Sequence, residues 1–195
     1  MHPTMFDTPI VSTLLRWLSI LTLKLCGWKV EGSAPEELKK CVMIAAPHTS
    51  NWDLPFMLWI AFALRVKIYW MGKESIFKFP FRGLMMWMGG VPVDRSQSNN
   101  LVSASVDAIT GHDRLFLIVP PEGTRSKVRS WKTGFYHIAA GAKVPILLGF
   151  LDFERKAGGI GPTVVPSGDM EKDMAEIKAF YATVKGKRSD LYHSE

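Results

Sequence analysis

Two short stretches of the sequence hold the side chains best suited to chemistry, and the first contains a histidine and a carboxylate. His48 follows a short apolar run and precedes Asp53 by five residues. A carboxylate beside an imidazole fixes the ring's tautomer and stabilises its protonated form, so such a pair can act as a general base without a metal or cofactor. The same residues also have a purely structural interpretation, in which Asp53 caps the helix that Pro55 opens.

The second stretch, residues 121–125, joins an acid, a glycine and a base directly after another apolar run. Gly123 lets the backbone approach a ligand closely, and Arg125 offers a bidentate fork to a phosphate. Lys73 ends a further extended run and is suited to supply a point charge to the same anion. Taken singly, each of these residues also fits a solvated surface turn.

The elements that must position these residues alternate between strands and helices. Short apolar runs predict strands at 41–46, 66–71, 91–93, 115–119, 146–150 and 160–165. Helical spacing and capping residues predict helices at 9–30, 53–64, 81–88, 99–110, 132–142 and 169–185, with 27–40 as a turn and exposed segment. Such alternation is typical of an α/β fold with a mainly parallel central sheet flanked by helices, in which strand ends gather reactive side chains. We expect one domain, residues 1–195.

The composition excludes several classes of protein. Apolar residues make up 47% and charged residues 22% of the chain, as in a globular protein. The net charge of +6 favours anionic lipid or acidic partners, while the lack of a nucleic-acid-binding motif argues against a nucleic-acid partner. No spacing of His and Cys predicts a metal site, and no glycine-rich fingerprint predicts a nucleotide cofactor. Cys26 and Cys41 are expected to be unbridged, buried small hydrophobes.

Residues 1–30 lack the features of a secretory signal, and their apolar stretch is too short to span a bilayer. Apolar positions recur near helical spacing from residue 9 to residue 30. Such a helix can lie in a membrane interface, with Trp17 at headgroup depth and Arg16 and Lys24 near anionic lipid. It can equally pack as an ordinary amphipathic helix on the core.

Four blocks of sequence, in this order, resemble the glycerolipid acyltransferase family, which includes the lysophosphatidate acyltransferases. The blocks are His48 with Asp53; the segment from Lys73 and Glu74 through Pro80, Gly83 and Gly90 to Asp94 and Arg95; Pro121 to Ser126; and Val144 to Ile146. Together they span residues 45–146, about half of the chain. The chain departs from the family at Pro47, where members often carry asparagine, and at the bulky Asn51 and Trp52 inside the first block.

This resemblance implies roles for the candidate residues. His48 is the implied base that deprotonates the acceptor hydroxyl, and Asp53 is its orienting partner. The implied donor is an acyl thioester of coenzyme A or acyl carrier protein, used as a co-substrate, with no other cofactor. Since the sequence has no nucleophilic serine elbow, the acceptor hydroxyl itself attacks the thioester. The implied substrate-binding residues are Lys73, Glu122, Gly123, Thr124 and Arg125.

The expected activity is therefore acyl transfer to a lysophospholipid, most simply from lysophosphatidate to phosphatidate, by a protein held peripherally at the cytoplasmic face of a membrane. Three alternatives remain open at this point. One is transfer to another hydroxyl acceptor, such as a lyso-aminolipid or a sugar lipid. The others are a non-catalytic peripheral lipid-binding protein and a thioesterase in which water replaces the acceptor.

Overall fold

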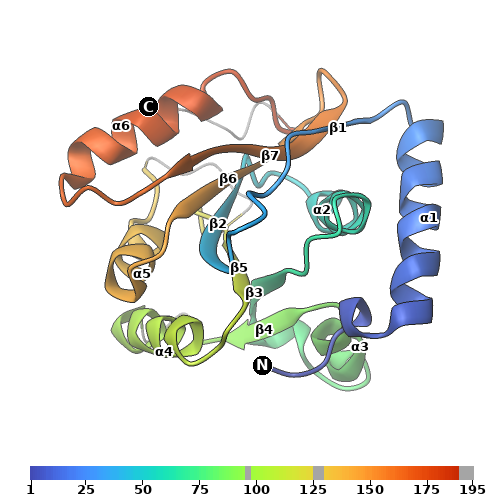
Figure 1. Cartoon of the computed structure of the whole chain (residues 1–195), viewed down its shortest axis with the longest axis horizontal. Helices are drawn as coiled ribbons and strands as arrows, with labels where there is room; N and C mark the ends of the chain where they lie inside the picture. The colour runs from blue at the N-terminus through green and yellow to red at the C-terminus, as the bar shows by residue number, and fades with distance from the viewer. Residues whose placement is uncertain (95–97, 125–129, 189–195) are drawn as a thin grey trace.

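The computed structural model describes residues 1–94, 98–124 and 130–188 (Figure 1). Within these residues seven strands form one sheet, in the order β1-β7-β6-β2-β5-β3-β4. All neighbouring strands are parallel except β6 and β7, which form an antiparallel hairpin. The strands are β1 (Lys29–Glu31), β2 (Lys40–Ala46), β3 (Tyr69–Lys73), β4 (Gly90–Val93), β5 (Leu115–Val119), β6 (Ile146–Asp152) and β7 (Ala157–Val164). The expected mainly parallel sheet is thus confirmed.

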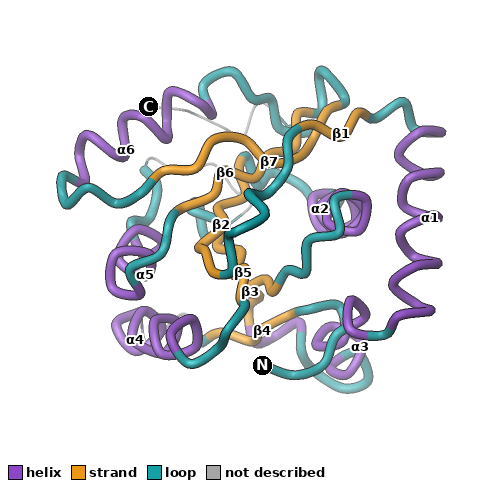
Figure 2. Tube along the Cα trace, in the orientation of Figure 1, coloured by secondary structure: helices purple, strands orange, loops and turns teal. Residues whose placement is uncertain are grey.

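Helices cover both faces of this sheet (Figures 1 and 2). The helices of the described residues are η1 (Met5–Asp7), α1 (Pro9–Leu25), α2 (Asp53–Ala63), η2 (Glu74–Ile76), α3 (Arg82–Trp87), α4 (Ser98–Thr110), α5 (Gly134–Ala142) and α6 (Met170–Tyr181). One face packs on α4, α5 and α6, and the other on α2 and α3, with α1 outside α2. Alternate residues of β2 divide between them: Val42 and Ile44 join the first core, and Met43 joins the second.

The burial of these elements follows from their position between layers. Leu115, Phe116, Leu117 and Ile118 of β5 are all buried, because a central parallel strand is covered on both faces. Helix α2 is apolar on every side, since one side faces the sheet and another faces α1. The apolar pattern of both segments therefore reports complete enclosure rather than a single buried face.

Three strands differ by three residues or more from the sequence-based expectation, and one of them is β7, which begins at Ala157 rather than at residue 160. Strand β1 lies within the segment expected to be an exposed connection, and its three residues pair with β7 at the sheet edge. The pairing depends on Gly159, where an added Cβ would lie 1.8 Å from the carbonyl oxygen of Glu31. Strand β3 begins at Tyr69 rather than Val66, because the chain is still turning at Arg65, which has a φ of 57°.

Helix α1 has apolar residues on both its inner and its outer side. Leu23 is buried, and Leu15 packs against the core that α2 shares. The outer side exposes six large apolar side chains: Ile10, Leu14, Trp17, Leu18, Leu21 and Leu25. The structure therefore combines the two expectations for this segment, since α1 packs on α2 and still presents an apolar stripe to its surroundings. Among the described helices, none has the length and apolar character needed to cross a membrane.

The two cysteines differ in environment. Cys41 is buried in β2 as expected, and burial raises the pKa of its thiol. The expectation is wrong for Cys26, which is exposed. The reason is its position as the C-cap of α1, beyond Leu23, the last buried residue of that helix.

Candidate functional site

A tight turn between β2 and α2 brings His48 and Asp53 together. One carboxylate oxygen of Asp53, Oδ2, accepts the backbone N–H of Ser50 at 2.9 Å, and Ser50 Oγ accepts the N–H of Trp52 at 3.2 Å. Pro55 fits the first turn of α2, where a backbone N–H has no helical partner. Trp52, not Asp53, is the N-cap of α2, so the expectation that Asp53 caps this helix is wrong. Asp53 instead turns its carboxylate back over the loop.

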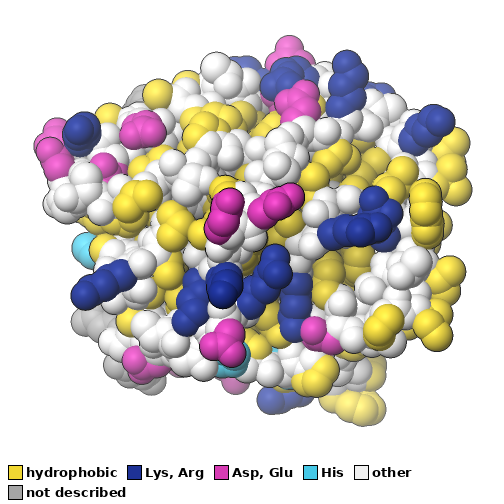
Figure 3. All heavy atoms as spheres, viewed as in Figure 1, with side chains coloured by type: hydrophobic (Ala, Val, Ile, Leu, Met, Phe, Trp, Pro, Cys, Tyr) yellow, Lys and Arg dark blue, Asp and Glu magenta, His cyan; other side chains and the backbone are white. Residues whose placement is uncertain are grey.

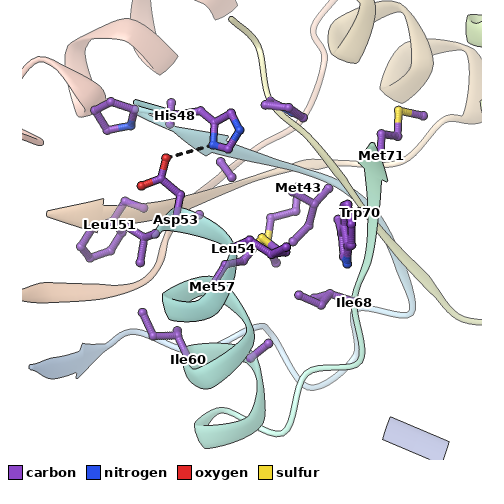
Figure 4. Close-up of a pocket in the computed structure, with 18 of the residues that line it drawn as sticks. Met43, His48, Asp53, Leu54, Met57, Ile60, Ile68, Trp70, Met71 and Leu151 are labelled. Carbon is purple, nitrogen blue, oxygen red and sulfur yellow. Dashed lines mark ion pairs between the residues drawn. The ribbon is translucent and has the colours of Figure 1, made fainter. Parts of the chain in front are cut away.

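The imidazole and the carboxylate are in direct contact (Figure 4). His48 Nδ1 lies 3.0 Å from Asp53 Oδ2; the Asp53 side chain is 6% exposed and that of His48 is 23% exposed. A neutral imidazole that donates from Nδ1 to a carboxylate leaves Nε2 as an acceptor. Asp53 also lies at the first turn of α2, where the helix dipole favours its negative charge. The geometry is that of an oriented base.

Glu122 supports this pair from the neighbouring loop. Since β2 and β5 are adjacent parallel strands, the loops that follow them meet at one edge of the sheet. The carboxylate of Glu122, 4% exposed, accepts the backbone N–H of His48 at 2.9 and 3.1 Å. Burial raises the pKa of Glu122, the His48 N–H lowers it and the Asp53 charge raises it, and the pKa reaches about 8. Glu122 thus fixes the main chain of the histidine, and burial together with the charge of Asp53 favours its protonated form.

The raised pKa of Glu122 makes a prediction about stability. Between pH 4.5, the ordinary pKa, and about pH 8, the folded protein keeps the proton of Glu122 while the unfolded chain loses it. The contribution of this proton to the stability of the fold is therefore complete at low pH and is lost as the pH rises to about 8. We expect the free energy of unfolding of the parent to fall across this range relative to Glu122→Gln, by on the order of 5 kcal/mol. Urea unfolding of both proteins against pH measures the difference; parallel curves would contradict it.

An apolar cavity of about 390 Å³ extends from this pair between the sheet and α2. Met43 of β2, Trp70 of β3 and Ile68, just before β3, line it on the sheet side, while Leu54 and Met57 line it from α2 (Figure 4). Ala61 of α2 lines it as well. Its lining is mainly hydrocarbon, so the cavity suits an alkyl chain rather than a polar metabolite. The sequence did not predict this cavity, although the uniformly apolar segment directly after Asp53, now α2, was an available signal.

Most of the predicted substrate-binding residues gather at the same cavity. Lys73, Gly123 and Thr124 line it together with His48 and Asp53. Gly123 has a φ of 66°, which only glycine adopts readily, and it lets the loop run close to the cavity. Arg125, predicted to bind phosphate, lies outside the described residues, as does Arg95.

Two further segments lie at the site without having been predicted. The side chain of Lys132 passes close to Gly123, where an added Cβ would lie 3.2 Å from Lys132 Cδ. The chain after α6 crosses the His48 loop: the N–H of Arg188 donates to Thr49 Oγ1 at 3.2 Å, and Lys187 Nζ lies 4.5 Å from the ring centre of Trp52. Neither segment belongs to a recognisable motif, and both contacts depend on the tertiary fold.

Within residues 1–94, 98–124 and 130–188, no three side chains of His, Cys, Asp or Glu gather closely enough to hold a metal ion. The site combines the oriented imidazole, the apolar cavity beside it and the cation of Lys73 at the mouth of that cavity. This combination suits deprotonation of a hydroxyl next to a bound acyl chain.

Comparison with known proteins also points to acyl-transferring relatives. A sequence model of the family described as Acyltransferase matches residues 28–147. Relatives named 1-acyl-sn-glycerol-3-phosphate acyltransferase, from Haemophilus influenzae and Escherichia coli, are 32% and 31% identical over 70% and 63% of this chain. The chain spans 59% and 52% of the length of these two relatives.

A solved structure has the same fold. It is that of the 1-acyl-sn-glycerophosphate acyltransferase PlsC from Thermotoga maritima, which aligns with a TM-score of 0.63 and 19% identity over 87% of this chain and 76% of its own. The likeness shows that the fold is shared. The match of the family model, in turn, confirms the family expected from the four sequence blocks. The family model extends from the start of β1 into β6 and so covers more than half of this chain; the chain therefore belongs to the acyltransferase family.

Proposed function

We propose that this protein transfers a fatty acyl group from a thioester of coenzyme A or acyl carrier protein to the hydroxyl of a lysophospholipid, most simply lysophosphatidate. The single observation that carries the proposal is the contact of His48 with Asp53 at an apolar cavity. The names of the relatives from Haemophilus influenzae and Escherichia coli support lysophosphatidate as the acceptor.

In the proposed reaction, His48 Nε2 removes the proton of the acceptor hydroxyl while its oxygen attacks the thioester carbonyl carbon. A tetrahedral intermediate forms, the carbon–sulfur bond breaks, and the departing thiolate takes the proton from His48. Asp53 stabilises the imidazolium that exists between the two proton transfers. The acyl chain occupies the cavity, so the carbonyl is held at its mouth beside the base.

The proposed acceptor phosphate lies among the polar residues of the mouth. Lys73 contributes a cation there, and Thr124 contributes a hydroxyl at the same rim. Gly123 leaves room for the acceptor, Glu122 holds the His48 backbone, and Arg125 remains a predicted phosphate ligand. Positive groups at this rim suit the phosphate monoester of lysophosphatidate.

We further propose that the protein works peripherally at the cytoplasmic face of a membrane, through residues 1–30. The outer stripe of α1 supports this, because large apolar side chains exposed in a continuous row match the interfacial region of a bilayer. Lys24 is exposed on the same helix and is suited to contact anionic lipid. A lysophospholipid acceptor is found in that location.

An acceptor panel tests the proposed function. Labelled acyl thioester is supplied with lysophosphatidate, a lyso-aminolipid, a sugar lipid or no acceptor, and the products are separated. Phosphatidate as the main product supports the proposal, while preference for another acceptor would replace lysophosphatidate in it. Free fatty acid formed equally fast without acceptor would indicate a thioesterase, and vesicle binding without any product would indicate a lipid-binding protein.

Ala61→Leu tests the role of the cavity. Ala61 lines the cavity from α2, so three added carbon atoms shorten the space for the acyl chain. We expect kcat/KM for long-chain thioesters to fall by about fourfold for each methylene that loses its place, while short-chain thioesters are unaffected. Competition between decanoyl and hexadecanoyl thioesters measures the change. Ala63→Leu, on the part of α2 that faces α1, is the matched control, and an equal effect there would contradict the assignment.

A further inference from the structure

Residues 78–84, here called the aromatic turn, expose an unusual concentration of apolar surface. It comprises the end of the connection between η2 and α3 and the first three residues of α3. Phe79 is 96% exposed, Phe81 is 60% exposed and Leu84 is 48% exposed. Single exposed apolar residues are common, but a contiguous group of large side chains marks an interaction site.

The fold holds these side chains outward. Phe77 is buried directly before the turn and stacks on Trp70 with ring centres 5.8 Å apart. Its ring occupies a socket made by Gly72 and Gly90, where added Cβ atoms would lie 2.9 and 2.7 Å from it. The backbone N–H groups of Phe81 and Arg82 donate to the carbonyl of Lys78 at 2.9 and 3.1 Å. The turn is thus anchored on one side, and exposure of Phe79 and Phe81 is built in.

The aromatic turn lies between the cavity mouth and the start of α1. Ile76, just before the turn, lines the cavity and is itself 43% exposed, so apolar surface continues from the mouth to the turn. On its other side, Phe77 shares a core cluster with Met5, which precedes α1. Helices α1 and α3 lie on the same side of the molecule, where hydrophobic side chains gather (Figures 1 and 3).

Charge identifies the partner. Lys78 and Arg82 are exposed at both ends of the Phe79-Pro80-Phe81 sequence. Apolar side chains flanked by cations match a bilayer whose acyl region lies beneath anionic headgroups. We propose that the aromatic turn is a second lipid-inserting element, separate from α1, which buries Phe79, Phe81 and Leu84 below the headgroups of an anionic bilayer. The proposal does not depend on acyl transfer or on membrane binding by α1.

Vesicle flotation without substrate tests this inference. The probe is vesicles of phosphatidylethanolamine and phosphatidylglycerol, and the variant is Phe79→Ser with Phe81→Ser. We expect its partition coefficient to fall by about tenfold or more, because two aromatic side chains no longer enter the bilayer. Val165→Ser is the matched control, since Val165 is 71% exposed beyond the end of β7, and its partition should not change. Equal thermal midpoints verify that all variants are folded.

Three comparisons separate this inference from its alternatives. Leu14→Ser with Leu18→Ser tests α1 independently, so either element can fail without the other. Lys78→Glu with Arg82→Glu should weaken binding to vesicles containing phosphatidylglycerol but not to phosphatidylcholine vesicles.

Unchanged flotation of the Phe79 and Phe81 variant would overturn the proposal. So would unchanged flotation with a loss of self-association in sedimentation velocity, which would assign the turn to contact between two copies of the chain. His48→Ala should float like the parent, whatever its activity.

Discussion

His48→Ala is expected to lower the turnover of acyl transfer by about 10³-fold while leaving the protein folded. Among the described residues, the imidazole is the titratable group that combines contact with a buried carboxylate and access to the cavity. Without it, the acceptor hydroxyl must lose its proton to water. The rate of phosphatidate formation under saturating substrates measures the loss, and urea unfolding verifies that the fold is retained.

The matched control for this variant is His137→Ala, which removes an exposed imidazole from α5. Its turnover should equal that of the parent. Added imidazole should restore part of the activity of His48→Ala, since a free base can enter the space left by the ring. Turnover close to that of the parent in His48→Ala would remove the basis of the proposed mechanism.

Asp53→Asn is expected to lower turnover by about 10²-fold or more, although the substitution preserves the shape of the side chain. An amide can donate to His48 Nδ1, which would place the ring proton on Nε2 and leave no acceptor for the hydroxyl proton. The loss should appear in kcat rather than in KM, because Asp53 acts through the imidazole and is buried beneath it.

A double variant gives this prediction its sharpest test. If Asp53 acts only by orienting His48, then His48→Ala with Asp53→Asn should be no slower than His48→Ala alone. Additive losses would show that Asp53 contributes by another route. Asp107→Asn, an exposed position on α4, controls for the loss of a negative charge and should leave kcat unchanged.

Local sequence was sufficient for the parts of the molecule that short-range physics determines. Strand β5 has the bounds expected from its apolar run, 115–119, because burial on both faces requires an uninterrupted run. His48 and Asp53 could be paired from their spacing, since five residues with a turn between them bring two side chains together. The same reasoning could not find β1, whose pairing depends on Gly159, more than a hundred residues away.

The wider site depends on contacts that spacing cannot encode. Glu122 was expected to be a substrate-binding residue, and its hydrogen bond to the His48 backbone was not predicted, because that contact follows from the register of β2 against β5. The segment from Lys185 to Arg188 reaches the His48 loop because α6 ends above it, and no local pattern indicates where a chain returns. Periodicity identified α1 as amphipathic but left open which side would face outward.

Helix α2 is a wall shared by two compartments. One of its sides lines the cavity through Leu54, Met57 and Ala61, and another packs against α1 through Phe56, which shares a cluster with Leu23. Ile60 takes part in both contacts. A substitution that shifts this helix by a fraction of an ångström therefore alters both the width of the cavity and the packing of α1. Fatty-chain selection and attachment to the lipid surface are therefore coupled through α2, so a substitution that changes one of these traits is expected to change the other.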